Sequence, residues 1–140
     1  MTEIRFSVPG TPVAKGRPRF ARRGNFVSTY TDSKTASYEN LVKVKAEEAM
    51  QGRPAIDGAV DVRICLYVTP PASWSQKKQR AALAGDIFPT SKPDWDNCAK
   101  IICDAINEIV FRDDKQIVDG RVIKRYAETA RATVEVRSMQ

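Results

Sequence analysis

Alternating hydrophobic and polar positions predict strands in four parts of this chain. Two segments show a clear period of two, which is typical of half-buried strands. The alternating positions are Ile4, Phe6 and Val8 in the first and Val60, Val62, Ile64, Leu66 and Val68 in the second. Residues 116–127 and 130–137 are two further predicted strands, with Gly120 as a possible bulge. Gly24-Asn25, between 19–20 and 26–27, indicates a hairpin turn.

A helical period of three to four residues predicts three helices. The first starts at a cap on Thr31 or Asp32 and runs to about Met50, with Gly52 and Pro54 beyond its end. The second is short and is capped by Ser73 or Ser75. The third begins at about Asp96 and ends near Phe111. The expected inner stripes are Tyr38, Leu41, Val42, Lys45 and Ala49 in the first helix and Ala99, Ile102, Cys103, Ile106, Ile109 and Val110 in the third.

Strands interspersed with helices predict a single compact α+β domain, with a mixed sheet and about three helices. The chain has 140 residues and shows no internal repeat or linker that would divide it. We therefore expect one domain spanning residues 1–140.

The stretch from Lys92 to Gln116 is rich in aspartate around a lysine. Asp96, Lys100 and Asp104 are spaced i, i+4 and i+8, which places them along one side of the predicted helix. Asp94 lies two residues before Asp96 in an extended approach and can project beside it. Asp113 and Asp114 follow the helix and are close enough in sequence to fold back. Three or four carboxylates are therefore expected to converge.

A convergent group of carboxylates requires a compensating cation, because unpaired like charges repel and are costly to bury. Oxygen ligands favour Mg²⁺, or Mn²⁺ as a substitute, over zinc. The chain contains no histidine, and Cys65, Cys98 and Cys103 lack the C-x-x-C spacing of a zinc site. The absence of histidine also excludes Ser-His-Asp and Cys-His catalysis.

Each acidic residue also has a purely structural interpretation. Asp96 can be a helix cap, Asp104 and Lys100 an exposed ion pair, and Asp113-Asp114 a turn. Taken together they favour a metal site, because clustered carboxylates with perturbed pKa values mark functional positions.

The positive charge of the chain lies away from this acidic stretch. Lysine and arginine number 23 against 17 acids, a net charge of +6. One basic cluster is a Gly- and Pro-containing arm that suits a phosphate backbone, and another accompanies the short second helix. These candidate DNA-binding residues are Lys15, Arg17, Arg19, Arg22 and Arg23 in the arm and Lys77 and Lys78, followed by Arg80, in the second cluster. A solvated face that aids solubility is the alternative for both clusters.

Basic arms beside a carboxylate metal site predict phosphodiester hydrolysis, in which the metal activates a water while the arms grip the backbone. The motifs in these segments also resemble those of a known family. The pattern K-P-D-x-D-N-x-x-K-x-x-x-D-A, from Lys92 to Ala105, followed by D-D-x-Q at 113–116, is similar to the RusA family of Holliday-junction resolvases. The G-x-P-x-x-K-G-R-P-R-F run at 10–20 and the Ser-Trp-Ser with Lys-Lys at 73–78 resemble phage-type members.

The resemblance implies roles for individual residues. Asp94, Asp96 and Asp114 correspond to the essential metal-binding acids, and Lys100 to the catalytic lysine. Three further residues take supporting roles: Asp113 as a second or alternative metal ligand, Asp104 as the partner that orients Lys100, and Asn97 beside the acids.

The resemblance also implies Mg²⁺-dependent cutting of four-way DNA junctions by a homodimer, with paired symmetric nicks and no small-molecule cofactor. A two-fold substrate is cut twice most simply by a two-fold enzyme. We expect water to attack in line and leave a 5′-phosphate and a 3′-hydroxyl. No apolar run approaches the roughly 20 residues that span a bilayer, and the MTEIRF start is no signal peptide. We expect a cytoplasmic protein of a bacterial or phage-infected cell.

Two other functions fit the same residues. The first is a catalytically silent junction-binding protein, which would bind junctions equally with Mg²⁺ or a chelator and never cut them. The second is another phage metal nuclease that acts on flaps or mismatches, which a comparison of junction, flap and duplex substrates would separate.

Overall fold

The structure, a computed structural model, describes residues 2–14, 19–23, 26–30 and 33–140, with the backbone alone at 19–23 and 26–30. Ten elements follow one another along the chain. They are β1 (Glu3–Pro9), β2 (Arg19–Arg23), β3 (Phe26–Tyr30), α1 (Ser33–Met50), β4 (Val60–Val68), α2 (Gln76–Leu83), α3 (Trp95–Ile106), the 3-10 helix η1 (Asp114–Gln116), β5 (Ile117–Tyr126) and β6 (Arg131–Ser138).

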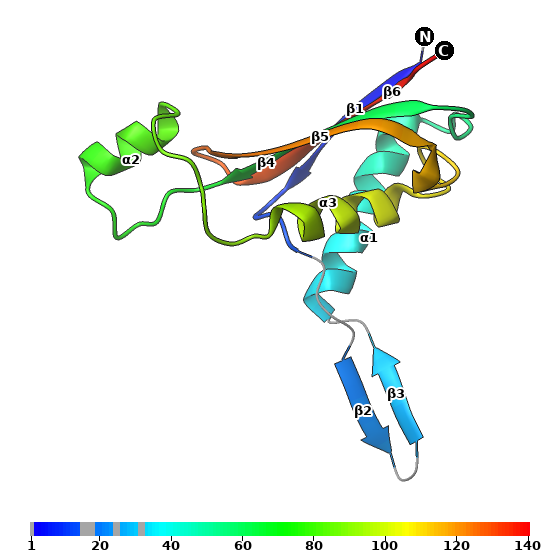
Figure 1. The fold of residues 1–140 in the computed structure, drawn as a ribbon, viewed down its shortest axis with the longest axis horizontal. Helices are drawn as coiled ribbons and strands as arrows, with labels where there is room; N and C mark the ends of the chain where they lie inside the picture. Colours follow the sequence, from blue (N-terminus) through cyan, green and yellow to red (C-terminus); the bar gives the residue numbers. More distant parts are fainter. Residues whose placement is uncertain (1, 15–18, 24–25, 31–32) are drawn as a thin grey trace.

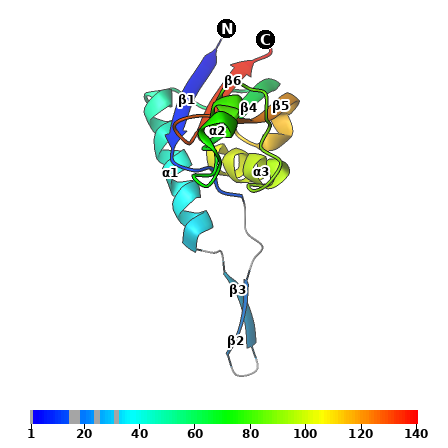
Figure 2. The same cartoon turned by 90° about the vertical axis from the view of Figure 1, so that its left-hand side faces the viewer.

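A mixed four-stranded sheet in the order β1-β6-β4-β5 forms the centre of the fold. β6 pairs antiparallel with both β1 and β4, whereas β4 and β5 run parallel. Helices α1 and α3 lie on the same face of this sheet, while α2 lies beyond its end (Figures 1 and 2). β2 and β3 form a separate hairpin in which Arg23 pairs with Phe26. The predicted turn residues Gly24 and Asn25, and the predicted caps of α1 at Thr31 or Asp32, lie outside the described residues. The predicted α+β fold with a mixed sheet and three helices is confirmed.

The core lies between the sheet and the two helices that cover it. β1 and β4 alternate as predicted, with Ile4 and Val8 and then Val62, Ile64 and Leu66 turned inward. In α1 the buried stripe recurs every four residues, at Tyr38, Val42, Ala46 and Met50. The expected members Leu41, Lys45 and Ala49 are only half-buried, because the stripe runs along a single i+4 row rather than across the wider face that we predicted.

Helix α3 is shorter than predicted, and its buried face is turned about the helix axis relative to the predicted stripe. It ends at Ile106, not near Phe111, because Glu108 adopts a positive φ of 68° and the chain turns inward. Val110 and Phe111 are then fully buried without being helical, and Phe111 bridges to Ile56. The buried face of α3 is centred on Cys98, Ile101, Ile102, Ala105 and Ile106, so that Ala99 and Cys103 are half-buried at its edges.

The predicted bulge at Gly120 is misplaced. The register between β4 and β5 shifts between Val60 and Asp61, which pair with Ile117 and Asp119. Val118 is therefore the extra residue, and its side chain is exposed. The extra residue lets the chain pass from η1 into β5 while the pairing that follows stays in register.

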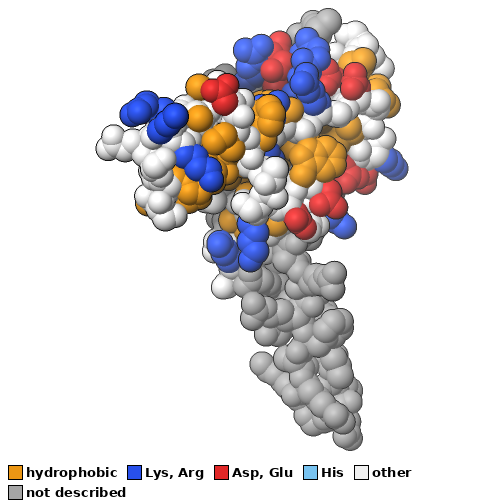
Figure 3. Space-filling view, turned by 60° about the vertical axis from the view of Figure 1, so that its left-hand side comes forward, with side chains coloured by type: hydrophobic (Ala, Val, Ile, Leu, Met, Phe, Trp, Pro, Cys, Tyr) orange, Lys and Arg blue, Asp and Glu red, His pale blue; other side chains and the backbone are white. Residues whose placement is uncertain are grey.

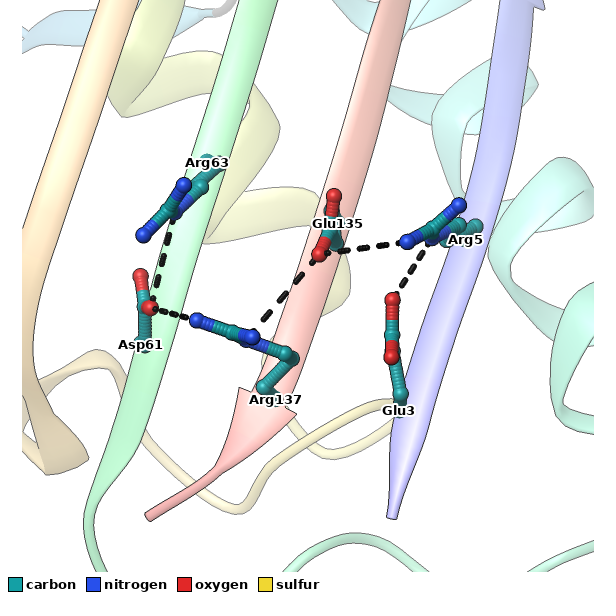
Figure 4. Close-up of polar contacts among 6 residues, drawn as sticks. All are labelled: Glu3, Arg5, Asp61, Arg63, Glu135 and Arg137. Carbon is teal, nitrogen blue, oxygen red and sulfur yellow. Dashed lines mark hydrogen bonds and ion pairs between the residues drawn. The ribbon is translucent and has the colours of Figure 1, made fainter. Parts of the chain in front are cut away.

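The sheet face opposite α1 and α3 carries a row of alternating charges (Figure 4). The Asp61 side chain is only 5% exposed, and its Oδ2 lies 3.1 Å from Arg137 Nη2 and 3.5 Å from Arg63 Nε. Arg137 also lies near Glu135, which in turn faces Arg5. Two arginines thus compensate the burial of Asp61, which would otherwise be costly.

In the ranges that the structure describes, no helix is both long enough and apolar enough to cross a membrane.

Candidate active site

Asp94 stands at the start of α3 and does not use its side chain to cap the helix. It occupies the N-cap position with extended backbone, where Asp96 was expected, and its carboxylate makes no capping hydrogen bond. Instead, Asp94 Oδ2 accepts a hydrogen bond of 3.0 Å from Asn97 Nδ2. The amide of Asn97 therefore orients this carboxylate, and most of its acceptor capacity stays turned to solvent.

Two side-chain hydrogen bonds between residues far apart in the sequence fix the start of α3 against the edge strand β5. The Trp95 indole Nε1 donates to the Val122 carbonyl at 2.7 Å, and Lys124 Nζ donates to the Ser91 carbonyl at 2.6 Å. Both contacts join residues distant in sequence, so they set where Asp94 lies relative to the sheet. Sequence reasoning missed them, although the tryptophan between two motif aspartates was a visible signal.

The outer face of α3 presents the acidic and basic residues that the sequence singled out. Asp96 and Lys100 are exposed and Asp104 is half-buried, opposite the stripe that contains Ile101 and Ala105. Lys100 lies one turn from each of the two aspartates, because residues four apart are neighbours on a helix. The i, i+4, i+8 row predicted for this helix thus lies within α3.

Gln116 fixes the segment that carries Asp113 and Asp114. Its side-chain Oε1 accepts from the backbone N–H of Arg112 at 2.8 Å and of Asp113 at 3.0 Å. Its Nε2 donates to the carbonyls of Ile56 at 2.9 Å and Gly58 at 2.8 Å. One amide therefore makes four hydrogen bonds, two with the backbone of Arg112 and Asp113 and two with the loop before β4. The D-D-x-Q motif contained this residue, but its spacing alone did not reveal its function.

Asp113 and Asp114 are neighbours with different environments. Asp113 Oδ1 caps η1 by accepting from the Lys115 N–H at 2.9 Å, and this hydrogen bond holds the pKa of Asp113 below its ordinary value. Burial first, and then the hydrogen bond with Asp113 and the negative charges of Asp113 and Asp104, raise the pKa of Asp114, while Lys100 acts in the opposite direction. The structure thus brings Asp104, Asp113 and Asp114 into one electrostatic group with Lys100.

The available donors are carboxylate oxygens rather than thiolates. The three cysteines are free, and burial raises the pKa of Cys98 to about 12 and that of Cys103 to about 11. Asp114 and Asp104 add to the rise at Cys103, which places that thiol beside them. Protonated thiols are poor metal ligands, so the donor set suits a hard cation such as Mg²⁺.

Within the described residues, no three Asp, Glu or Cys side chains are close enough together to hold one metal ion. Asp94 and Asp96 lie at the start of α3, whereas Asp114 is grouped with Asp104 near its other end. Mg²⁺ is commonly held by one or two carboxylates together with substrate phosphates, and such pairs are present here. The raised pKa of Asp114 reflects burial first and then the neighbouring charges of Asp113 and Asp104, which a cation would offset. The three-ligand assignment stays a prediction.

The predicted DNA-binding residues fall in two groups. Lys77 and Lys78 are exposed on α2, and Ser75 caps this helix by accepting from the Lys78 N–H at 3.2 Å, as predicted. The hairpin makes the basic arm partly a strand rather than a simple loop. Lys15 and Arg17 lie outside the described residues, and so do the side chains of Arg19, Arg22 and Arg23, whose backbone belongs to β2.

Comparisons with known proteins agree with the motifs. The family model described as Endodeoxyribonuclease RusA matches residues 9–137. An uncharacterized protein, YqaN of Bacillus subtilis (strain 168), is 38% identical over 140 residues, which cover 97% of this chain and 96% of the relative.

Proposed function

Because this chain belongs to the RusA family of endodeoxyribonucleases, whose activity is the resolution of Holliday junctions, we propose that it is a Mg²⁺-dependent homodimer that cuts four-way DNA junctions by paired symmetric nicks. The observation that supports this most directly is the acidic face of α3. Asp96, Lys100 and Asp104 share that face, and Asp104 and Lys100 act electrostatically on Asp114 from the following segment. Asp104 and Lys100 of α3 thus influence an acid from a second chain segment, which supports the proposal.

We assign Asp94, Asp96 and Asp114 as the residues that would hold Mg²⁺, with Mn²⁺ as a substitute. Because no three acids among the described residues lie close enough to hold one ion by themselves, substrate phosphates would complete the coordination. Asp114 is preferred over Asp113 because the Asp113 carboxylate is already committed to capping η1. The pKa of Asp114 is raised by burial first and then by its contacts with Asp113 and Asp104, and a bound cation would offset this penalty on the charged form. When bound, the ion supplies Lewis-acid stabilisation of the phosphate and lowers the pKa of the attacking water.

Lys100 is assigned to the phosphate rather than to a purely structural ion pair. Its ammonium group lies on the exposed face of α3, one turn from Asp96 and Asp104. There it would offset negative charge that builds up on the phosphate oxygens during cleavage. Asp104 would keep the lysine pointing along the helix, and Asn97 would hold the Asp94 carboxylate. The expected products carry a 5′-phosphate and a 3′-hydroxyl.

Two-fold symmetry of the substrate supports the homodimer. One site per subunit places two equivalent nicks across the junction when the subunits are related by a two-fold axis. Analytical ultracentrifugation of the protein with and without junction DNA tests this part of the proposal, and a monomer in the junction complex would contradict it.

The experiment that tests the function uses synthetic DNAs with identical arms: a mobile four-way junction, a flap and a linear duplex. Each is incubated with the protein in Mg²⁺ or in a chelator, and the cuts are mapped on every strand. Symmetric ligatable nicks in the junction with Mg²⁺ alone are expected. Binding without cutting in either buffer would identify a catalytically silent junction-binding protein, and preferential cutting of the flap would identify a different branched-DNA nuclease.

A further inference from the structure

A groove leads away from Asp94 along the side of the molecule that carries α2. Its first part is a hollow of about 430 Å³ lined by Thr11, Lys34, Lys92 and Asp94, among others. A second hollow of about 220 Å³ shares Thr11 and Lys92 with the first and continues to Thr69 and Tyr126. Because they share Thr11 and Lys92, the two hollows are adjacent, and together we call them the groove. Asp94, which we assign to the catalytic site, lines the first hollow.

The polar lining of the groove comes from separate parts of the chain. Lys34 lies in the first turn of α1, Lys92 in the approach to α3, Thr11 after β1 and Thr69 after β4. A solvated surface hollow needs no such arrangement. Two lysines beside an acidic site instead match a ligand that is anionic along its length and extends past that site, as a sugar–phosphate backbone does.

Ring contacts join the far end of the groove to α2. The Trp74 ring packs edge-on against Tyr126, with ring centroids 5.5 Å apart, and Gln79 Nε2 donates to the Trp74 carbonyl at 2.9 Å. Lys78 Nζ lies 4.0 Å from the centroid of the Trp74 ring. Trp74 therefore packs between α2 and the end of β5, and we do not assign it to base stacking. Because Tyr126 lines the second hollow and contacts Trp74, the lysine that lies over the Trp74 ring is close to the end of the groove.

The surface on this side supports the same path. Figure 3 shows Lys and Arg side chains over the α2 end and a further group lower down on the same face. The described segment from Thr69 to Lys92 carries Lys77, Lys78, Arg80 and Lys92 but a single acid, Asp86. This charge is complementary to DNA and unlike that of the α3 face.

We propose that this groove holds the phosphodiester backbone of the strand that is cut, on one side of the scissile phosphate, with Lys34 and Lys92 each contacting a phosphate and α2 continuing the contact. The inference rests on the proposed function, because it takes Asp94 as part of the cutting site. It adds the path of the substrate strand, which neither the motifs nor the family match supplies.

The test measures junction binding in Ca²⁺ across a series of salt concentrations. Lys34→Ala and Lys92→Ala are each expected to weaken binding roughly two- to fivefold and to reduce the slope of log K against log salt by about 0.7 to 0.9. Lys43→Ala is the matched control, because Lys43 is an exposed lysine of the same helix as Lys34 but does not line the groove. Circular dichroism melts confirm that the variants fold.

A second measurement locates the phosphates. Single uncharged methylphosphonates are placed in turn along the cut strand. At one position or more, the substitution should weaken binding by the wild type but not by Lys92→Ala, because the contact is then already lost. The groove proposal is overturned if Lys34→Ala and Lys92→Ala behave like Lys43→Ala, or if the sensitive phosphates lie on the uncut strand. A wild-type protein that neither binds nor cuts junctions would instead overturn the proposed function.

Discussion

The replacement Gln116→Leu removes the amide that joins η1 to the loop before β4. Gln116 makes four hydrogen bonds of 2.8, 3.0, 2.9 and 2.8 Å to backbone groups of Arg112, Asp113, Ile56 and Gly58. A typical hydrogen bond contributes about 0.5 to 1.5 kcal/mol net. Because part of this network is exposed and water can replace some partners, we expect a loss of about 1 to 3 kcal/mol in the free energy of unfolding.

A loss of this size lowers the melting temperature by about 4 °C per kcal/mol for a domain of this length. Activity should fall further than stability accounts for, because Asp113 and Asp114 are no longer held in one place. A misplacement of about 1 Å costs on the order of 100-fold in rate. Single-turnover junction cleavage, measured well below the melting temperature, separates this effect from unfolding, while binding in Ca²⁺ should change little.

Gln79→Leu is the matched control, since Gln79 makes a single side-chain hydrogen bond, to the Trp74 carbonyl on the far side of the molecule. It should cost at most about 1.5 kcal/mol and leave the single-turnover rate at saturating protein unchanged, because Gln79 does not contact the Asp113–Asp114 segment. If Gln116→Leu were as stable and as active as the wild type, the assignment of Gln116 as the residue that positions the Asp113–Asp114 segment would be refuted.

Four further predictions concern the acids and the lysine. Asp96→Asn should abolish cutting while junction binding, followed by gel shift, is kept or strengthened, because a charge that repels phosphate is removed; lost binding in a folded protein would contradict this. Lys100→Met should lower the single-turnover rate roughly 100-fold with little change in binding in Ca²⁺, and a larger effect on binding than on rate would reject its assigned role. Asp114→Asn should raise the unfolding temperature at pH 7 in the presence of a chelator, because the raised pKa of Asp114 means that its charged form destabilises the fold. This gain in stability should vanish as the pH falls below the ordinary aspartate range, where the carboxyl group is protonated in both the folded and the unfolded state. Asp113→Asn should act in the opposite direction, since its lowered pKa contributes stability at neutral pH that is lost on acidification; melts of both variants across pH check the two signs, and equal signs would contradict them.

Strand positions could be predicted from the sequence more reliably than the ends of helices. The alternation in β1 and β4 follows from a sheet with one face on the core, and the structure reproduces it. The end of α3 could not be read in the same way, because Val110 and Phe111 keep a helical spacing while packing into the core from a turn. A periodic pattern records burial, and burial does not require helical backbone.

At the candidate site, too, local geometry could be predicted from the sequence and long-range contacts could not. The spacing of Asp96, Lys100 and Asp104 placed them on one helix face correctly, because that depends on local geometry alone. The contacts of Gln116 with Ile56 and of Trp95 with Val122 join residues far apart in the chain. Such partners are set by tertiary packing, so a single sequence could supply the residues but not their pairing.

The position of β6 inside the sheet has a consequence for biosynthesis. β6 is the final element along the chain, yet it lies between β1 and β4 and pairs with both. While the ribosome is still translating residues before Ser138, β1 has no neighbour in the sheet, and β4 can pair only with β5. The nascent chain therefore cannot complete its central sheet until Arg131–Ser138 have left the exit tunnel, so β1 and β4 are joined through β6 only after the other described elements have been synthesised.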